Sequence, residues 1–224
     1  MNEYIKRIGR VSAPILVHLG ISFLVVYAGT VICMWQRWDG PDAALMTVLS
    51  AAFSAPFLWK MWKRDRLLLS AAAEQKGKPV WFYVLAFGSG VLASCLGSLL
   101  MQVSGAADFF SNAVQEELFA GNIWVQLLGM GFVTPAVEEL IFRGLFYQRL
   151  RESLPRGYAA AITALIFALW HQNPLQMLYA FPMGLLLQFF YCMENPADRC
   201  GSLKAPILFH MGANLISIAV EYFV

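Results

Sequence analysis

Two adjacent glutamates and an arginine lie inside a largely apolar stretch of the chain, Val133–Leu150 (VTPAVEELIFRGLFYQRL), well before Arg149 near its end. Glu139 and Arg143 are four residues apart, so on a helix they share a face and lie within pairing distance. Glu138 lies about 100° around the same helix and has no local cation. Glu139 is therefore expected to stay ionised, and Glu138 is the candidate to take up and release a proton. An ion pair that only locks helices together is the alternative interpretation.

A histidine, His171, ends the next apolar run in the stretch FALWHQNP. If Leu154–Pro155 is the tip of a helical hairpin, Glu138 and His171 both lie about sixteen residues from it, roughly 24 Å at about 1.5 Å per residue. Equal offsets on antiparallel helices bring two residues to similar height, so we expect these side chains to face each other. Pro135 predicts a bend or a loosened turn just before Glu138.

His210 and Asn214, in the stretch LFHMGANL, are also four residues apart and share a helix face. An imidazole and an amide aimed at one point are donors that a developing oxyanion requires. A polar contact between helices is the alternative. Together, the three groups offer a general base, a polarising partner and an oxyanion site, which suits the attack of water on an amide.

The elements that must position these residues are membrane helices. The 224-residue chain is 59% hydrophobic and 13% charged, with a mean hydropathy of +0.59. Long apolar runs read as membrane spans, and such spans are helical because lipid cannot satisfy backbone polar groups. The sequence predicts an all-α, polytopic helical bundle of about seven transmembrane helices. The expected spans are Val11–Gln36, Ala43–Trp62, Pro79–Gln102, Asn122–Arg149, Gly157–His171, Pro174–Met193 and Leu203–Phe223.

The basic residues predict the orientation of the bundle. If the loops alternate between sides from an inner N-terminus, fourteen of the sixteen Lys and Arg residues fall in inner segments. Only Arg37 falls outside, and Arg143 lies within a span. This positive-inside pattern predicts a cytoplasmic N-terminus. The same spread along one membrane face gives no support for nucleic-acid binding, and makes the lipid bilayer the expected partner.

We expect a single integral membrane domain over residues 1–224. Residues 1–121 hold the N-terminal spans and an outer interfacial segment, Gly105–Asn122, in which Phe109, Phe110, Val114 and Leu118 are expected on one face. Residues 122–224 form the core that carries the polar groups. The third span presents Gly90, Ser94 and Gly97 for close helix packing. A second glutamate pair, Glu116–Glu117, is expected to be solvated, and His18 to be packed or interfacial.

The three polar groups resemble the motifs of the CAAX protease and bacteriocin-processing family of intramembrane endopeptidases, which is related to the type II CAAX prenyl endopeptidase. That family has Glu-Glu-x-x-x-Arg, then Phe-x-x-x-His, then His-x-x-x-Asn or Asp. The corresponding residues here are Glu138, Glu139 and Arg143, then Phe167 and His171, then His210 and Asn214. The motifs occur in order between about Asn122 and the C-terminus, whereas the first three spans match only as generic membrane helices.

The resemblance implies hydrolysis of a peptide bond in a membrane-associated protein or peptide, without a cofactor. It implies that Glu138 is the general base and that His171 holds the water. His210 and Asn214 would stabilise the oxyanion, with Glu139 and Arg143 as the supporting pair. The site would lie in a cavity open to lipid and to the cytoplasmic side. A bacterial plasma membrane is the expected location. The substrate and the oligomeric state are left open.

Three other readings stay open. Glu138, His171 and His210 could bind zinc with an open fourth position, which would make the protein a metalloprotease. The chain could instead be a non-catalytic membrane scaffold or bacteriocin immunity protein. Buried glutamate and histidine also serve as proton relays in transporters, although we find no internal repeat of the kind that transporters usually show.

Overall fold

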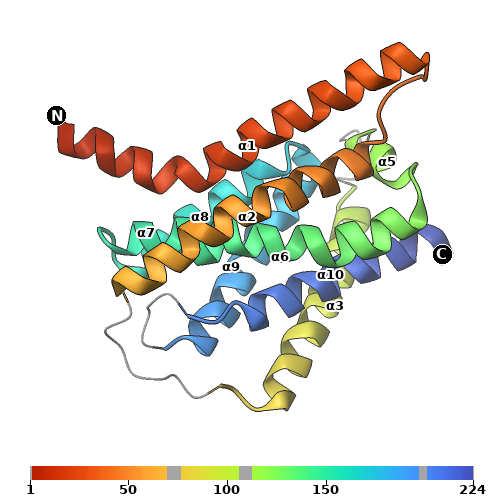
Figure 1. Cartoon of the computed structure of the whole chain (residues 1–224). Helices are drawn as coiled ribbons and strands as arrows, with labels where there is room; N and C mark the ends of the chain where they lie inside the picture. The colour runs from red at the N-terminus through yellow and green to blue at the C-terminus, as the bar shows by residue number, and fades with distance from the viewer. Residues whose placement is uncertain (1, 70–76, 106–112, 197–200, 224) are drawn as a thin grey trace.

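A computed structural model describes residues 2–69, 77–105, 113–196 and 201–223, and every regular element in these ranges is helical. The all-α prediction is confirmed (Figure 1). The expected interfacial face with Phe109 and Phe110 lies outside the described residues. The elements are α1 (Asn2–Gln36), α2 (Ala43–Leu69), α3 (Val80–Val103), α5 (Ala113–Phe119), η1 (Val125–Val133), α6 (Thr134–Glu139), η2 (Leu140–Phe146), α7 (Tyr147–Arg151), α8 (Arg156–Trp170), α9 (Pro174–Glu194) and α10 (Lys204–Phe223).

Each of the seven predicted spans corresponds to a helix or to a run of consecutive helices. One of them is shorter than a membrane-spanning helix. Within the described ranges, six helices are long and apolar enough to cross a membrane. One of them, Val125–Arg151, consists of η1, α6, η2 and α7 in succession and is called the central helix below. The remaining helix, α8, has 15 residues. It is about 22 Å long, against roughly 30 Å of hydrocarbon core. Seven crossings therefore stay a prediction.

The two ends of the bundle differ in charge. At one end, Arg10 Nη1 lies 2.9 Å from a carboxylate oxygen of Glu152, and Arg149 Nε lies 2.7 Å from Asp65 Oδ2. These pairs join α1 and α2 to α7 and the residue that follows it, and Arg149 is only 2% exposed. The burial of this positive charge is tolerated because Arg149 is paired with Asp65. We call this the Lys/Arg-rich end, on the left in Figure 1 beside the N-terminus.

The opposite end, here called the Lys/Arg-poor end, holds the turn at Arg37, α5 and the C-terminal end of α10 (Figure 1). The Tyr222 hydroxyl donates to the carbonyl oxygens of Phe119 and Gly121, each at 3.3 Å. This contact fastens the end of α10 to α5. The sorting of basic residues predicted from the sequence is thus present in the three-dimensional arrangement of the described helix ends.

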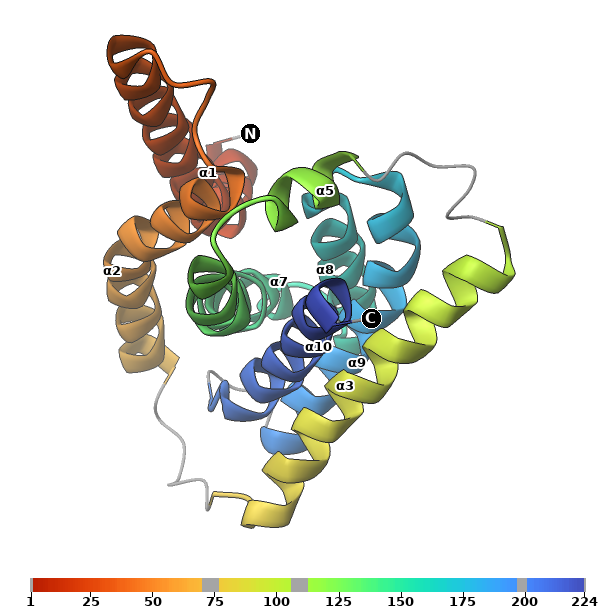
Figure 2. The ribbon, with the colours of Figure 1, turned by 90° about the vertical axis from the view of Figure 1, so that its right-hand side faces the viewer.

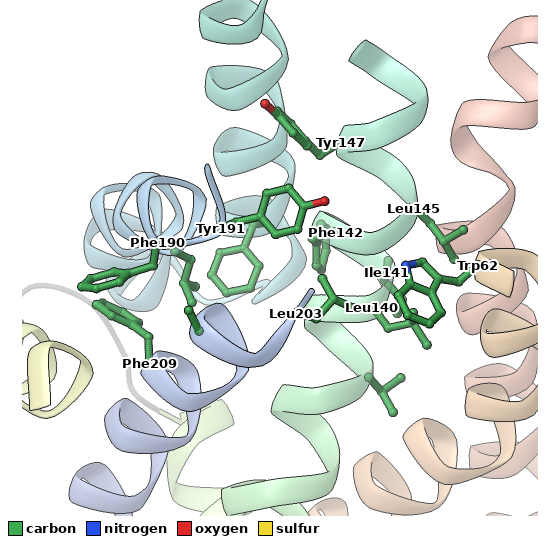
Figure 3. Packing of buried hydrophobic residues seen from close by; sticks show 14 of the residues in the cluster. Trp62, Leu140, Ile141, Phe142, Leu145, Tyr147, Phe190, Tyr191, Leu203 and Phe209 are labelled. Atoms are coloured by element: carbon green, nitrogen blue, oxygen red, sulfur yellow. The ribbon is translucent and has the colours of Figure 1, made fainter. Parts of the chain in front are cut away.

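The hydrophobic core lies around the second half of the central helix. Phe142 and Tyr147 are fully buried there, and Tyr191 and Leu203 pack around them (Figure 3). Two of these residues are close in sequence to basic residues of that end: Tyr147 precedes Arg149, and Leu203 precedes Lys204. Tyr191 lies three residues before Glu194. The core therefore fills the side of the molecule toward the Lys/Arg-rich end.

Of the predicted small face of α3, Gly90 and Ser94 pack against α10, whereas Gly97 lies against Tyr179 of α9 (Figure 2). A Cβ atom on Gly90 would lie 1.8 Å from the Phe209 carbonyl oxygen, and one on Gly212 would lie 2.4 Å from the Phe87 carbonyl oxygen. Ser94 and Ser217 share a hydrogen bond of 2.9 Å. The two backbones meet directly because neither glycine has a side chain, as small-residue packing in membranes requires.

We predict that Gly90→Ala lowers the thermal stability of the purified protein in detergent. The added methyl group has no space and must push α10 away, and overpacking of this kind typically costs about 1–3 kcal/mol. The matched control is Gly88→Ala on the same helix, where an added Cβ meets no atom within 4 Å. Equal melting temperatures for the two variants would contradict the close approach of α3 and α10.

Candidate active site

The central helix has widened turns on both sides of the glutamate pair, because η1 and η2 are π-helical and α6 between them is α-helical. The Thr134 N–H donates to the Gly129 carbonyl five residues back. The next residue, Pro135, has no N–H to donate to Met130. The Met130 carbonyl instead accepts a hydrogen bond of 2.9 Å from the Asn214 amide. The loosened turn expected at Pro135 therefore connects the central helix to α10.

The predicted pair of Glu139 and Arg143 is present and is fully buried. Arg143 Nη1 donates to Glu139 Oε1 at 3.0 Å, and Nη2 donates to the Gly184 carbonyl on α9 at 2.9 Å. The guanidinium also lies over the Phe167 ring of α8, 4.7 Å from its centroid. Such a cation–π contact and such hydrogen bonds compensate for the removal of a charge from water.

His210 lies between the two glutamates. Its Nδ1 is 2.9 Å from Glu139 Oε1, and its Nε2 is 3.7 Å from Glu138 Oε2. An ionised carboxylate only accepts hydrogen bonds, so Nδ1 carries the proton. The neutral imidazole then has an acceptor at Nε2, and the protonated imidazolium donates on both sides. Glu139 is fully buried, whereas the Glu138 side chain is 13% exposed. This difference matches the unequal environments expected for the pair.

His171 has the same kind of arrangement. Its Nδ1 lies 2.9 Å from the Phe167 carbonyl oxygen, an acceptor, which leaves Nε2 of the neutral ring as an acceptor. The Phe167 ring packs edge-on against both imidazoles, with centroids 5.0 Å from His171 and 5.6 Å from His210. Glu138 and His210 both act electrostatically on His171. That Glu138 and His171 face each other directly stays a prediction.

A cavity of about 100 Å³ adjoins this cluster. Its wall includes His171, His210 and Asn214. The other lining residues come from α5, the central helix, α8, α9 and α10. They are Leu118, Phe119, Met130, Phe167, Gln176, Tyr179, Ala180, Met183, Leu187, Ser217 and Ile218. The second and third motifs thus line one space, and the glutamate pair of the first motif adjoins it through His210.

The sequence did not indicate the carbonyl partners of the site. The contacts of Gly184 with Arg143 and of Met130 with Asn214 are made by backbone oxygens, which every residue has. The missing N–H of Pro135 was the one available signal. The expectations for the other acidic pair and for His18 are confirmed: Glu116 and Glu117 are exposed, and His18 is buried, 2.7 Å from the Ser54 hydroxyl and against Trp170.

Comparison with protein families identifies the part of the chain that carries the site. Residues 120–216 match the family described as type II CAAX prenyl endopeptidase Rce1-like. This region, which is less than half of the chain, is similar to the Rce1-like family. The resemblance inferred from the three motifs is confirmed, and a protease activity is supported. The Rce1-like region contains all six predicted site residues, while α1, α2 and α3 lie outside it. Comparison with curated proteins and with solved structures gave no match.

The residues proposed as zinc ligands are near one another, but their contacts are to protein groups. Among the described residues, no group of three or more His, Cys, Asp or Glu side chains is arranged to hold a metal ion. His171 and His210 line the cavity, and Glu138 lies 3.7 Å from His210. Independence from metal stays a prediction, and it is tested below.

We predict that Arg143→Ala destabilises the protein strongly. The substitution leaves Glu139 buried with only His210 as a partner, and breaking a buried pair commonly costs about 3–5 kcal/mol. Melting temperature and membrane yield in detergent measure the effect. Arg64→Ala, at an exposed position of α2, is the control and is expected to change stability by less than about 0.5 kcal/mol. Wild-type stability of Arg143→Ala would show that the pair is not a structural support.

Proposed function

We propose that the protein is an intramembrane endopeptidase that hydrolyses a peptide bond of a membrane-associated protein or peptide with a glutamate-activated water. The observation that carries the proposal is the division of the glutamate pair. Glu139 is held by Arg143 and His210, whereas Glu138 keeps partial exposure beside His210. One carboxylate is thus fixed as a structural anion, and the other is left to exchange a proton.

In the first step, Glu138 removes a proton from a water molecule, and the water oxygen attacks the carbonyl carbon of the scissile amide. The Nε2 acceptor of His171 orients that water by accepting its second hydrogen. Positioning of water between two fixed acceptors also lowers the entropic cost of the attack.

The attack places negative charge on the former carbonyl oxygen. Asn214 uses one amide hydrogen on Met130, which leaves its second amide hydrogen to donate to this oxyanion. His210 donates from Nε2 in its protonated form, which Glu139 stabilises at Nδ1. The tetrahedral intermediate then collapses as the carbon–nitrogen bond breaks, and Glu138 returns its proton to the leaving amine. Preorganised donors of this kind are a large source of rate enhancement.

The proposal includes a location in a bacterial plasma membrane, crossed several times. The separation of Lys/Arg-rich and Lys/Arg-poor ends supports an orientation with the rich end in the cytoplasm. A scaffold or immunity protein without turnover would use the same fold, so the measurement of peptide cleavage separates the two functions.

We predict that Glu138→Gln abolishes measurable cleavage of a transmembrane peptide while the protein keeps its melting temperature. The amide keeps the shape of the side chain and removes the base, and loss of a general base typically lowers the rate about 10²- to 10⁴-fold. Glu117→Gln, at an exposed position of α5, is the matched control and should cleave normally. Normal cleavage by Glu138→Gln would remove Glu138 from the role of base.

We also predict that activity survives strong chelators. The purified protein should contain no stoichiometric zinc by elemental analysis, because the proposed steps use only side chains and water. Chelator-treated wild type is compared with untreated protein and with protein supplied with zinc. Inactivation by chelator, followed by recovery on addition of zinc, would assign Glu138, His171 and His210 to a metalloprotease centre.

A further inference from the structure

Two exposed basic residues near the end of α2, Lys60 and Arg64, form no hydrogen bond or ion pair within the part of the chain that the structure describes. They are four residues apart, so they lie on one face of the helix, where two like charges repel each other. The single acidic residue in the sequence of α2 is Asp65, which is 1% exposed and binds Arg149. No carboxylate of the same helix therefore balances the two charges.

The two other exposed basic residues of α2 are held by aromatic rings. Lys63 Nζ lies over the Trp59 ring, 5.6 Å from its centroid. Arg66 Cζ lies over the Trp62 ring, 4.7 Å from its centroid. Contacts of this kind stabilise a cation through the negative face of the ring. The pair without such a partner is therefore the part of this basic segment that is available to an external anion.

Two exposed phenylalanines lie on the same face of α2 as the unpartnered pair. We call this set the α2 stripe, and it consists of Phe53, Phe57, Lys60 and Arg64. At 3.6 residues per turn, the four residues fall within about 60° of one another around the helix. The phenylalanine side chains are 58% and 60% exposed. The buried residues of the same segment lie on the other side of the helix and are Ala51, Ser54, Leu58, Trp62 and Asp65.

The stripe is apolar first and cationic second along the helix axis. Its phenylalanines belong to the apolar part of a helix, Ala43–Leu68, that is long enough to cross a membrane. Its two cations follow toward the Lys/Arg-rich end (Figure 1). Phe57 and Lys60 are only about 4.5 Å apart along the axis. An anionic phospholipid has the same order of groups, since its acyl chains are apolar and its phosphate lies at the membrane surface.

We propose that the α2 stripe is a binding site for an anionic phospholipid. The phosphate lies against Lys60 and Arg64, and an acyl chain lies against Phe53 and Phe57. Basic residues at the end of a membrane helix attract anionic headgroups. A second copy of the chain does not fit here, because two copies with the same orientation in the membrane would bring their cations together. The site lies outside the Rce1-like region and does not require peptidase activity.

The site is tested by photo-crosslinking in nanodiscs that contain equal amounts of dioleoylphosphatidylglycerol, which is anionic, and dioleoylphosphatidylcholine, which is zwitterionic. In the full chain, p-benzoylphenylalanine replaces Phe57, and mass spectrometry of the adducts gives the ratio of the two crosslinked lipids. The same replacement at Phe23, a 71% exposed residue of α1 far in sequence from Lys and Arg, reports the ratio in the surrounding bilayer.

We expect the anionic lipid to be enriched at Phe57 relative to Phe23. Two basic residues near a headgroup correspond to a preference of roughly thirtyfold. Joint substitution of the two cations, Lys60→Gln with Arg64→Gln, should return the ratio at Phe57 to the ratio at Phe23. Equal ratios at the two positions of the otherwise unchanged chain would overturn the proposal.

The matched control is Lys63→Gln with Arg66→Gln, which removes the same charge from the same helix and should leave the enrichment in place. An equal loss in this control would show that only the general charge of the helix end attracts lipid, and would overturn the stripe as a site. Crosslinks from Phe57 to a second copy of the chain would do the same.

A soluble phosphate is separated from a lipid by one further arm of the experiment. Glycerol 3-phosphate, added at equal ionic strength, should leave the enrichment at Phe57 unchanged, because it has no acyl chain to contact the phenylalanines. Loss of the enrichment would assign the site to a soluble phosphate and overturn the lipid. Both double variants should melt at the temperature of the wild type in detergent without added lipid, since all four substituted residues are exposed.

Discussion

The site depends on one buried carboxylate, Glu139. A fully buried charge is costly unless it is paired and hydrogen-bonded, and here a single oxygen, Oε1, accepts from both Arg143 and His210. Arg143 in turn bonds to the Gly184 carbonyl and lies over Phe167. One negative charge therefore fastens the central helix to α8, α9 and α10, which are the helices that carry the rest of the site.

This arrangement explains why two adjacent glutamates have different roles. On a helix, adjacent side chains point in directions about 100° apart, so only one of them can meet Arg143. The other, Glu138, meets the opposite nitrogen of the same imidazole. His210 therefore links the structural carboxylate to the proposed base. Glu139 fixes the proton of His210 at Nδ1. Nε2 is therefore an acceptor when the ring is neutral and a donor when the ring is protonated.

The N-terminal helices lie outside the Rce1-like region, yet they contribute to its geometry. Gly90 of α3 contacts the backbone at Phe209, immediately before His210. Asp65 of α2 binds Arg149 near the end of the central helix. The first contact restrains α10 against α3, and the second restrains the central helix against α2. The positions of His210 and Glu138 are thus supported from both sides of the site by residues that take no part in the proposed chemistry.

The sequence by itself determined the helical class and the approximate limits of seven apolar segments, and it singled out the six polar residues that we propose for the site. It could do so because burial in lipid demands long apolar helices, and because charged groups within them are conspicuous. The pairing of Glu139 with Arg143 was also predictable, since four-residue spacing on one helix is a local property.

The tertiary structure decided everything that depends on contacts between distant segments. His210 contacts both glutamates, although it lies seventy-one residues from Glu139 in the sequence. No local spacing pattern predicts a contact between residues so far apart in the chain. The backbone acceptors at Gly184 and Met130 have no side-chain signature. The length of α8 and the burial of Arg149 follow from how helices pack. Packing brings together surfaces that are far apart in the sequence, and for that reason a linear pattern indicates the polar groups but not the distant contacts that hold them.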